Sequence, residues 1–173
     1  MLDRRSALTS ARPYASPVLQ IGEARGFSLL QVAGPAKAIS PITGKLPAKV
    51  GTALQAEGRT LMRTGENQFW IIGPENDGIA TELSGIAILT PLSHSRTRIF
   101  IEGAPARDVL AKGIPLDFDV HEFKPGMFAM TGLHHTPVLV HCTETSRFEI
   151  YALRTFALSV YDWLTDAALE YAQ

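Results

Sequence analysis

The stretch "TRIFIEGAPARDVLAKG", Thr97–Gly113, sets a strand directly before a helix. Thr97–Ile101 is a β-prone apolar run and predicts the strand. In the helix that follows, Pro105 suits the first turn, Lys112 suits the negative end of the helix dipole and Gly113 suits the stop. Val109 and Leu110 give this helix an apolar side. The stretch therefore predicts a domain in which strands and helices are mixed along the chain.

The same signals predict further elements on both sides of this stretch. Arg59–Pro74 is typical of a hairpin that turns at Gly65-Glu66-Asn67. A weak helix opens at Gly34-Pro35, and a short one is predicted near Asn76–Leu83. Other β-prone runs predict strands at Val18–Ile21, Phe27–Val32 (these two as a strand pair), Ala87–Leu89, Met127–Thr131, Val138–Cys142 and Phe148–Leu153. The chain closes with a helix from about Thr155, whose predicted buried stripe is Phe156, Val160, Trp163, Ala167 and Tyr171.

Turn-marking residues recur at a nearly constant offset, which predicts an internal repeat. Thr64-Gly65 and Thr131-Gly132 are 67 residues apart, Gly34 and Gly103 are 69 apart, and Pro47 and Pro115 are 68 apart. We therefore predict an α+β fold built from two copies of a strand-strand-helix-strand-strand-helix unit, with residues near 27–73 matching residues near 97–142. The predicted organisation is a flexible N-terminal arm over 1–16 and one domain over 17–173, made of halves at about 17–85 and 86–173.

Composition excludes several classes of protein. The 173 residues are 46% hydrophobic and carry a net charge of −1, which gives no general attraction to nucleic acid or to an anionic membrane. No apolar run reaches the 18 residues typical of a membrane-spanning helix, and the N-terminal stretch lacks the apolar region of a signal peptide. The single cysteine excludes an internal disulfide and is compatible with the cytoplasm.

The stretch "TGLHHTPVLVHC", Thr131–Cys142, holds three of the five histidines and the only cysteine. Neighbours along a strand face opposite sides, so His141 and Cys142 are not expected to form a nucleophile–base pair. His135 and His141 would be roughly 20 Å apart along an extended strand, too far for one metal ion. We therefore predict no metal site, a buried Cys142, and His134 and His135 in a turn equivalent to Asn67 and Gln68.

Two other stretches carry polar side chains. In "LDFDVHE", Leu116–Glu122, an extended chain would place Asp117, Asp119 and His121 on one side, a donor set suited to iron; the alternation typical of a half-buried strand is the favoured interpretation. No GxGxxG, GxxxxGK[ST] or GxSxG fingerprint is present, so no catalytic residue is assigned and any cofactor-binding residues remain unknown. "LSHSRTRIF" is a candidate partner interface, with plain surface polarity as the alternative; its candidate residues are Ser93, His94, Arg96 and Arg98.

Several of these segments together resemble the γ subunit of heterotetrameric sarcosine oxidase. The resemblance covers about Val18 to Ala172 and is strongest over Leu92–Gly126 and the closing "RTFALSVYDWLTDAALEYA". Its elements are Ser93-His94-Ser95-Arg96, the run from Gly103 to Gly113, and Phe123-x-Pro125-Gly126.

This resemblance implies a duplicated fold like the folate-binding domain of the aminomethyltransferase T-protein. It implies a noncatalytic subunit that supports a complex oxidising sarcosine to glycine and peroxide, with the methyl carbon passed to tetrahydrofolate. FAD, FMN, NAD and the folate site are implied to lie on partner subunits, none on this chain. The implied partners are the larger α and β subunits and a small δ subunit, with self-association possible when the chain is isolated.

Two alternatives remain open at this point. One is a free-standing folate-binding or one-carbon transfer protein. The other is the equivalent subunit of a related complex, such as N-methylglutamate dehydrogenase, because substrate choice would reside in another chain.

Overall fold

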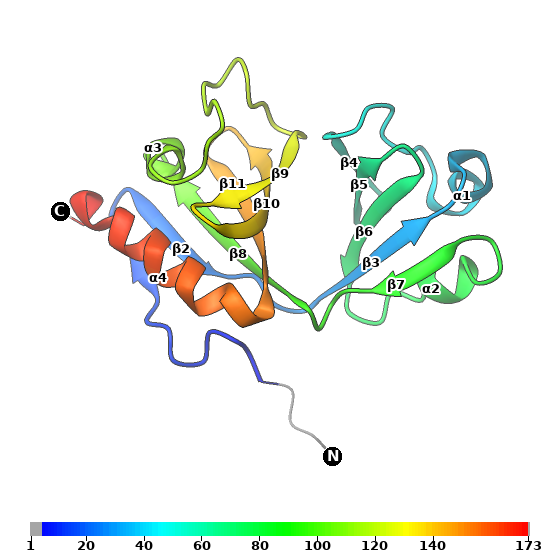
Figure 1. The fold of residues 1–173 in the computed structure, drawn as a ribbon, viewed down its shortest axis with the longest axis horizontal. Helices are drawn as coiled ribbons and strands as arrows, with labels where there is room; N and C mark the ends of the chain where they lie inside the picture. Colours follow the sequence, from blue (N-terminus) through cyan, green and yellow to red (C-terminus); the bar gives the residue numbers. More distant parts are fainter. Residues whose placement is uncertain (1–4, 173) are drawn as a thin grey trace. The chain divides into compact units, whose positions relative to one another are not determined.

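The computed structural model describes residues 5–172 and confirms the predicted α+β class. Two antiparallel sheets and a few short helices account for the regular structure. The chain forms two compact units (Figure 1). The smaller unit spans Arg25–His94, and the larger unit combines the described residues 5–24 with residues 95–172. No helix within 5–172 is long and apolar enough to cross a membrane.

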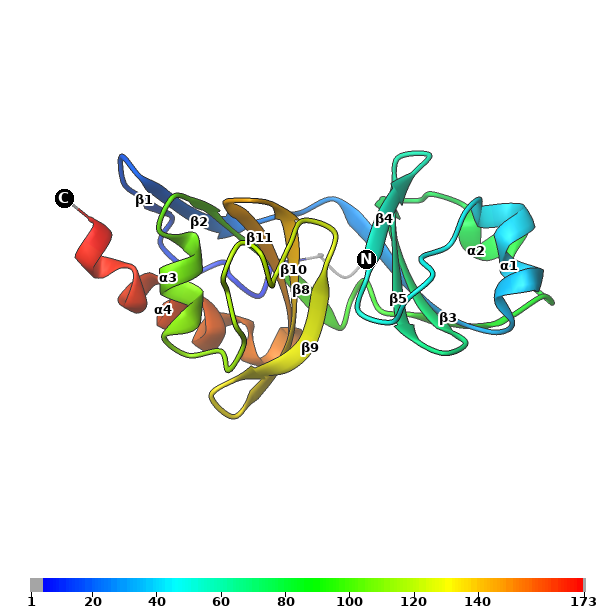
Figure 2. The ribbon, with the colours of Figure 1, turned by 90° about the horizontal axis from the view of Figure 1, so that it is seen from above.

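The smaller unit is a five-stranded sheet covered by two helices. In spatial order its strands are β4 (Ala53–Ala56), β5 (Arg59–Gly65), β6 (Gln68–Pro74), β3 (Phe27–Ala33) and β7 (Ile88–Pro91). Figure 2 shows the helices α1 (Ala36–Thr43) and α2 (Ile79–Glu82) on the same side of this sheet. Ile39 of α1 and Ile79 of α2 share one core with Val32, Phe69 and Ile71 of the strands. The apolar face of each element is thereby removed from water.

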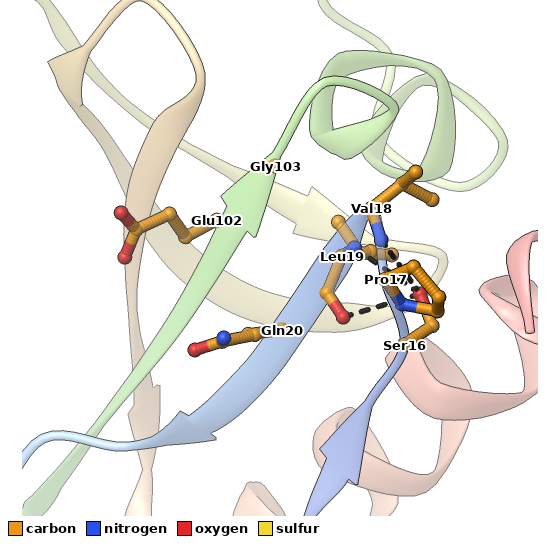
Figure 3. A pocket seen from close by; sticks show the side chains of 7 residues that line it. All are labelled: Ser16, Pro17, Val18, Leu19, Gln20, Glu102 and Gly103. Atoms are coloured by element: carbon orange, nitrogen blue, oxygen red, sulfur yellow. Dashed lines mark hydrogen bonds between the residues drawn. The ribbon is translucent and has the colours of Figure 1, made fainter.

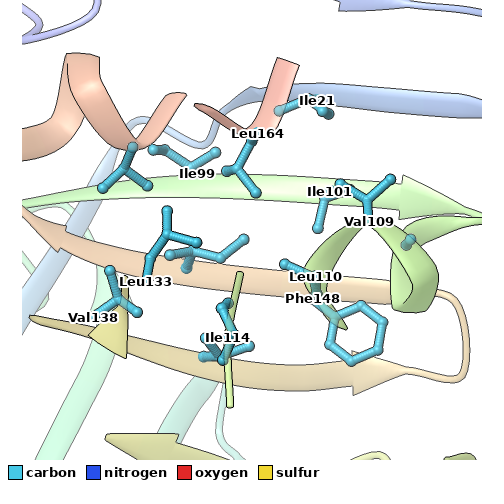
Figure 4. Close-up of a cluster of buried hydrophobic side chains, with 14 of the residues drawn as sticks. Ile21, Ile99, Ile101, Val109, Leu110, Ile114, Leu133, Val138, Phe148 and Leu164 are labelled. Atoms are coloured by element: carbon cyan, nitrogen blue, oxygen red, sulfur yellow. The ribbon is translucent and has the colours of Figure 1, made fainter. Parts of the chain in front are cut away.

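The larger unit repeats this plan with a six-stranded sheet. In spatial order its strands are β1 (Tyr14–Ala15), β2 (Leu19–Glu23), β8 (Arg96–Gly103), β11 (Arg147–Leu153), β10 (Thr136–Glu144) and β9 (Phe128–Leu133). Its helices are α3 (Ala106–Ala111), η1 (Arg154–Phe156), α4 (Ala157–Ala167) and η2 (Leu169–Tyr171). Figure 4 shows side chains of α3 and α4, such as Val109 and Leu164, meeting Ile99, Ile101 and Phe148 of the sheet.

The two copies of the repeat exchange their first strands. β2, the first strand of the first copy, pairs with β8 of the second copy. β7, the first strand of the second copy, pairs with β3 of the first copy, and β3 also pairs with β6. The strand pair predicted for Val18–Ile21 and Phe27–Val32 is therefore wrong. Each copy runs strand, strand, helix, three strands, helix, so the repeat is present with one strand more than predicted.

The strand order also corrects the match between the halves. When the strands are counted from the edge strands β4 and β9, the order β4-β5-β6-β3-β7 in the smaller sheet corresponds to β9-β10-β11-β8-β2 in the larger one. The hairpin β5–β6 therefore matches β10–β11 and not β9–β10. Both hairpins carry a register shift at a threonine, Thr64 in one and Thr143 in the other. The turn at His134-His135 is thus equivalent to Glu57-Gly58, and the proposed match to Asn67 and Gln68 is wrong.

The buried face of α4 differs from the predicted stripe. Ala157, Val160, Tyr161 and Leu164 are buried, whereas Phe156 is 44% exposed. Their spacing of three and four residues forms a stripe turned by about one position from the predicted one. Trp163 lies at the border of this stripe, partly buried against the core.

The described part of the N-terminal arm packs against the larger unit, in contrast to the flexible arm expected for 1–16. Leu8 is buried in the core of that unit, and the Tyr14 hydroxyl donates a hydrogen bond to the Ala168 carbonyl (2.6 Å). The Tyr161 hydroxyl shares its one hydrogen between the carbonyls of Arg12 (3.0 Å) and Ile21 (3.1 Å). These contacts join the arm to the C-terminal helix. The part of the arm before residue 5 lies outside the described residues.

Candidate functional site

Ser93, in the polar stretch after β7, lies where the hydrogen-bonded pairing of β3 with β7 ends. The Leu29 amide donates a hydrogen bond to Ser93 Oγ (2.9 Å), and the Leu92 amide donates to the Leu29 carbonyl (2.8 Å). Ser93 Oγ thus accepts the last amide hydrogen bond of β3 where the pairing between β3 and β7 ends. His94 follows it in a turn and is exposed. Of these two candidate interface residues, only His94 presents its side chain to solvent.

The two candidate arginines lie on one face of the central strand β8. Arg98 Nε is 3.9 Å from Glu149 Oε1 on the neighbouring strand β11, and the Tyr151 hydroxyl donates to Glu149 Oε2 (2.8 Å). Partial burial lowers the pKa of the Arg96 guanidinium from its ordinary value. Arg98 lies on a strand as predicted, whereas Glu149 and Tyr151 were not among the predicted site residues. The alternation of polar residues in "RFEIYAL" was the signal for them.

His141 belongs to the same polar cluster, which we define as Arg98, His141, Glu149 and Tyr151. It lies directly across the ladder from Glu149 and is only 3% exposed. Its Nδ1 atom has no hydrogen-bond partner among the residues that the structure describes. Burial, reinforced by Arg98 and opposed by Glu149, lowers the pKa of His141 to about 4. The imidazole is therefore neutral at physiological pH.

Burial also dominates the acidity of Tyr151. Desolvation, with the neighbouring Glu149 charge, raises the pKa of the phenol well above its ordinary value. A neutral histidine and a neutral tyrosine on either side of an Arg–Glu pair make a structural polar network, not an acid–base pair poised near neutrality.

Cys142 points to the opposite side of the sheet, as predicted. It is fully buried in the apolar core of the larger unit, where burial raises the pKa of its thiol. Its Sγ atom accepts a contact from Arg107 at 3.7 Å. A buried thiol with a raised pKa is a poor nucleophile, because the thiolate is the reactive form.

The remaining histidines are dispersed. His134 and His135 form the exposed turn between β9 and β10, and His134 meets the Trp163 ring edge-on at a centroid distance of 5.4 Å. Within residues 5–172, no three histidine, cysteine, aspartate or glutamate side chains are grouped as a metal site. The metal-free state of the protein stays a prediction.

The segment with Asp117, Asp119 and His121 is an exposed loop and not the half-buried strand favoured from its alternation. Asp117 Oδ1 accepts the Asp119 amide (2.8 Å), and Asp119 Oδ1 accepts the His121 amide (2.7 Å). Both carboxylates therefore stabilise turns of their own loop, a common use of aspartate.

Arg107 of α3 holds this loop in place, a role that sequence analysis did not assign. Its guanidinium donates to the carbonyls of Phe118 (2.6 Å), Phe123 (3.1 Å) and Thr145 (2.9 Å). The same group lies 5.1 Å from the centre of the Phe148 ring. Five donors in a rigid fork suit arginine to such a task.

A shallow pocket of about 210 Å³ lies at the turn between β1 and β2 (Figure 3). This volume is below the ~300–1,000 Å³ typical of small-molecule sites. Ser16 Oγ accepts the Leu19 amide (3.1 Å), and Glu102 is paired with Arg147, so these two polar side chains are already engaged in contacts within the fold. The lining residues are Ser16, Pro17, Val18, Leu19, Gln20, Glu102 and Gly103.

The chain resembles known proteins in sequence and in fold. No family model matches the sequence. The sarcosine oxidase subunit gamma of Arthrobacter sp. is 31% identical over 146 residues, covering 81% of this chain and 72% of the relative. The chain belongs to the sarcosine oxidase gamma-subunit family. The gamma subunit of Corynebacterium sp. (strain P-1) is also 31% identical, over 73% of this chain and 66% of its own length.

Solved structures agree with membership of the gamma-subunit family. A chain of the heterotetrameric sarcosine oxidase from Corynebacterium sp. U-96 matches with a TM-score of 0.88 and 25% identity, over 98% of this chain and 97% of that chain. The glycine cleavage system aminomethyltransferase T of Bartonella henselae matches with a TM-score of 0.62 and 18% identity. That match covers 86% of this chain and 46% of the transferase and shows the fold alone. The resemblance found from the sequence is confirmed.

Proposed function

We propose that this chain is a structural subunit of a heterotetrameric complex that oxidises sarcosine, and that it has no catalytic activity by itself. The observation that carries this proposal is the end-to-end match, 98% of this chain on 97% of the other, to a chain of heterotetrameric sarcosine oxidase. The larger α and β subunits and the small δ subunit are the proposed partners. The family likeness supports a cytoplasmic location.

The chemistry of the described side chains supports a noncatalytic role. His141 is neutral and buried, and the Cys142 thiol is buried with a raised pKa. The Arg107 guanidinium donates hydrogen bonds to loop carbonyls, and the Glu149 carboxylate accepts a hydrogen bond from Tyr151. Removing a hydride from an N-methyl group needs a redox cofactor. We propose that FAD, FMN, NAD and tetrahydrofolate all bind to the partner subunits.

The polar stretch Ser93, His94, Arg96 and Arg98 remains our candidate for part of the partner interface. Ser93 and Arg98 have structural contacts, so the exposed His94 is the residue best placed to meet a partner.

Co-expression of this chain with the larger subunits tests the proposal. We expect a stable complex that forms peroxide from sarcosine, and we expect the purified single chain to form none. The same complex should be assayed with N-methylglutamate, which separates the sarcosine oxidase from the related dehydrogenase. Tight binding of tetrahydrofolate to the single chain in calorimetry would favour the one-carbon transfer alternative, because fold likeness alone does not transfer folate binding.

A further inference from the structure

Strand β7 forms an open edge of the smaller sheet. Within the described residues, β7 is the last strand in the order β4-β5-β6-β3-β7, and β3 is its partner from Ile88 to Pro91. An open edge leaves alternate backbone groups directed away from the sheet, ready to pair with another strand.

The register identifies these outward groups. The Leu92 amide donates to the Leu29 carbonyl, and hydrogen-bonded pairs alternate along an antiparallel ladder. Thr90 and Ile88 therefore point their backbone groups toward β3. Leu89 points its amide and carbonyl outward, and Pro91 points its carbonyl outward.

The side chains beside this edge are apolar and exposed. Ile88 is 74% exposed, the largest value among the large hydrophobic side chains of the described chain, and Ile86 is 41% exposed. The eleven residues from Leu83 to Ser93, "LSGIAILTPLS", contain no charge. Soluble proteins usually protect such an edge with charged side chains or cover it with another element. Here the sequence supplies no charge.

We propose that β7 is a docking edge for an extended, uncharged segment of one of the larger subunits, which adds a strand to the smaller sheet. This inference rests on the proposed function. The outward amide and carbonyl of Leu89 would fix the position of the added strand, and Ile86 and Ile88 would supply the apolar contact. The exposed His94 follows this edge closely in the chain and extends the same surface.

The size of the edge favours a larger partner over a second copy of this chain. β7 is four residues long, so its pairing with its own twin would be confined to two short strands around a twofold axis. A stable interface typically buries about 1,600 Å². A large subunit can add contacts beyond the strand, which a second copy paired only through β7 would lack.

The experiment compares tagged wild-type and variant chains co-expressed with the larger subunits, with complex recovery and the dissociation constant as readouts. In Ile88→Lys the added charge should weaken association by about tenfold or more. In Leu89→Pro the outward amide is lost while the ladder to β3 is kept, and Leu89→Ala is its matched control with the amide intact. We expect Leu89→Pro to associate more weakly than Leu89→Ala. Leu169→Lys, at a side chain that is 59% exposed on η2, controls for adding charge at another apolar site.

The outcomes separate the two proposals. If the wild-type chain forms no complex, the proposed function is wrong, and the docking-edge proposal, which depends on it, is also wrong. If the wild-type chain assembles and both Ile88→Lys and Leu89→Pro assemble equally well, the docking edge alone is wrong. An isolated wild-type dimer that Ile88→Lys dissociates would assign the edge to a second copy and overturn the proposed occupant. Thermal melting of the isolated variants must show that each is still folded at the assay temperature, so that weakened assembly is not caused by unfolding. Leu89→Ala and Leu89→Pro both lose the packing of the Leu89 side chain against the core of the smaller unit, so their comparison isolates the amide.

Discussion

Protonation of His141 should destabilise the protein as the pH falls. In the folded chain its pKa is about 4, against an ordinary value of 6.5. Between these values the unfolded chain binds more protons than the folded chain, so the free energy of unfolding falls as the pH drops through the window. The full contribution is present above about pH 6.5. The gap between these two pKa values corresponds to about 3 kcal/mol, most of which is lost by pH 4.5.

The assay is urea unfolding of wild type and His141→Gln at several pH values from 7.5 to 4.5. Carboxylates also titrate in this range, but their contribution is common to both proteins and cancels in the difference. We expect wild type to lose about 2–3 kcal/mol more than the variant over this range. His134→Gln, the same substitution at an exposed turn, is the matched control. Parallel pH profiles for wild type and His141→Gln, within about 0.5 kcal/mol, would refute the burial argument.

Three further substitutions test the packing of the larger unit, with free energies of unfolding in urea as the common measurement. Arg107→Met removes hydrogen bonds to four backbone carbonyls, those of Phe118, Asp119, Phe123 and Thr145, and should cost about 3 kcal/mol, with faster proteolysis in residues 115–126. An unchanged cleavage pattern would contradict its anchoring role. Gly103→Ala should cost about 2–5 kcal/mol, since its φ is +142° and an added Cβ would lie 2.0 Å from the Val18 carbonyl oxygen. Trp163→Ala should cost about 3 kcal/mol, whereas Leu169→Ala, at an exposed position, should change stability by less than about 0.5 kcal/mol.

Local sequence signals predicted the elements better than their pairing. The helix after Gly103 and the strand before it are where Pro105, Lys112 and Gly113 placed them. The pairing of β2 with β8 joins residues about eighty positions apart, and no turn chemistry records it. The false match of the His134 turn arose from the same cause. A Thr-Gly pair precedes the turn of β5–β6 and also the turn of β9–β10, which suggested that these hairpins match. Only the strand order and the register shifts at Thr64 and Thr143 show that β5–β6 is equivalent to β10–β11.

Burial on both faces of a strand was the second limit. Alternation correctly separated His141 from Cys142, yet both side chains are buried, so alternation did not predict that the polar residue would also be buried. The sequence pattern alone could not distinguish the paired Arg98 from a free surface arginine. In α4, apolar residues cover more than one stripe, so spacing alone did not decide between Tyr161 and Trp163 as the buried ring.

The exchange of first strands has a consequence for synthesis of the chain. The residues of the smaller unit form one continuous segment, and they leave the ribosome before β8 is made. β2 emerges earlier than all of them but must wait for β8, its partner about eighty residues later. The larger unit therefore combines strands made before the smaller unit with strands made after it. A fragment that starts near residue 86 would lack β1 and β2, leave one side of β8 without its neighbour, and expose the apolar surface that Leu19 and Ile21 cover.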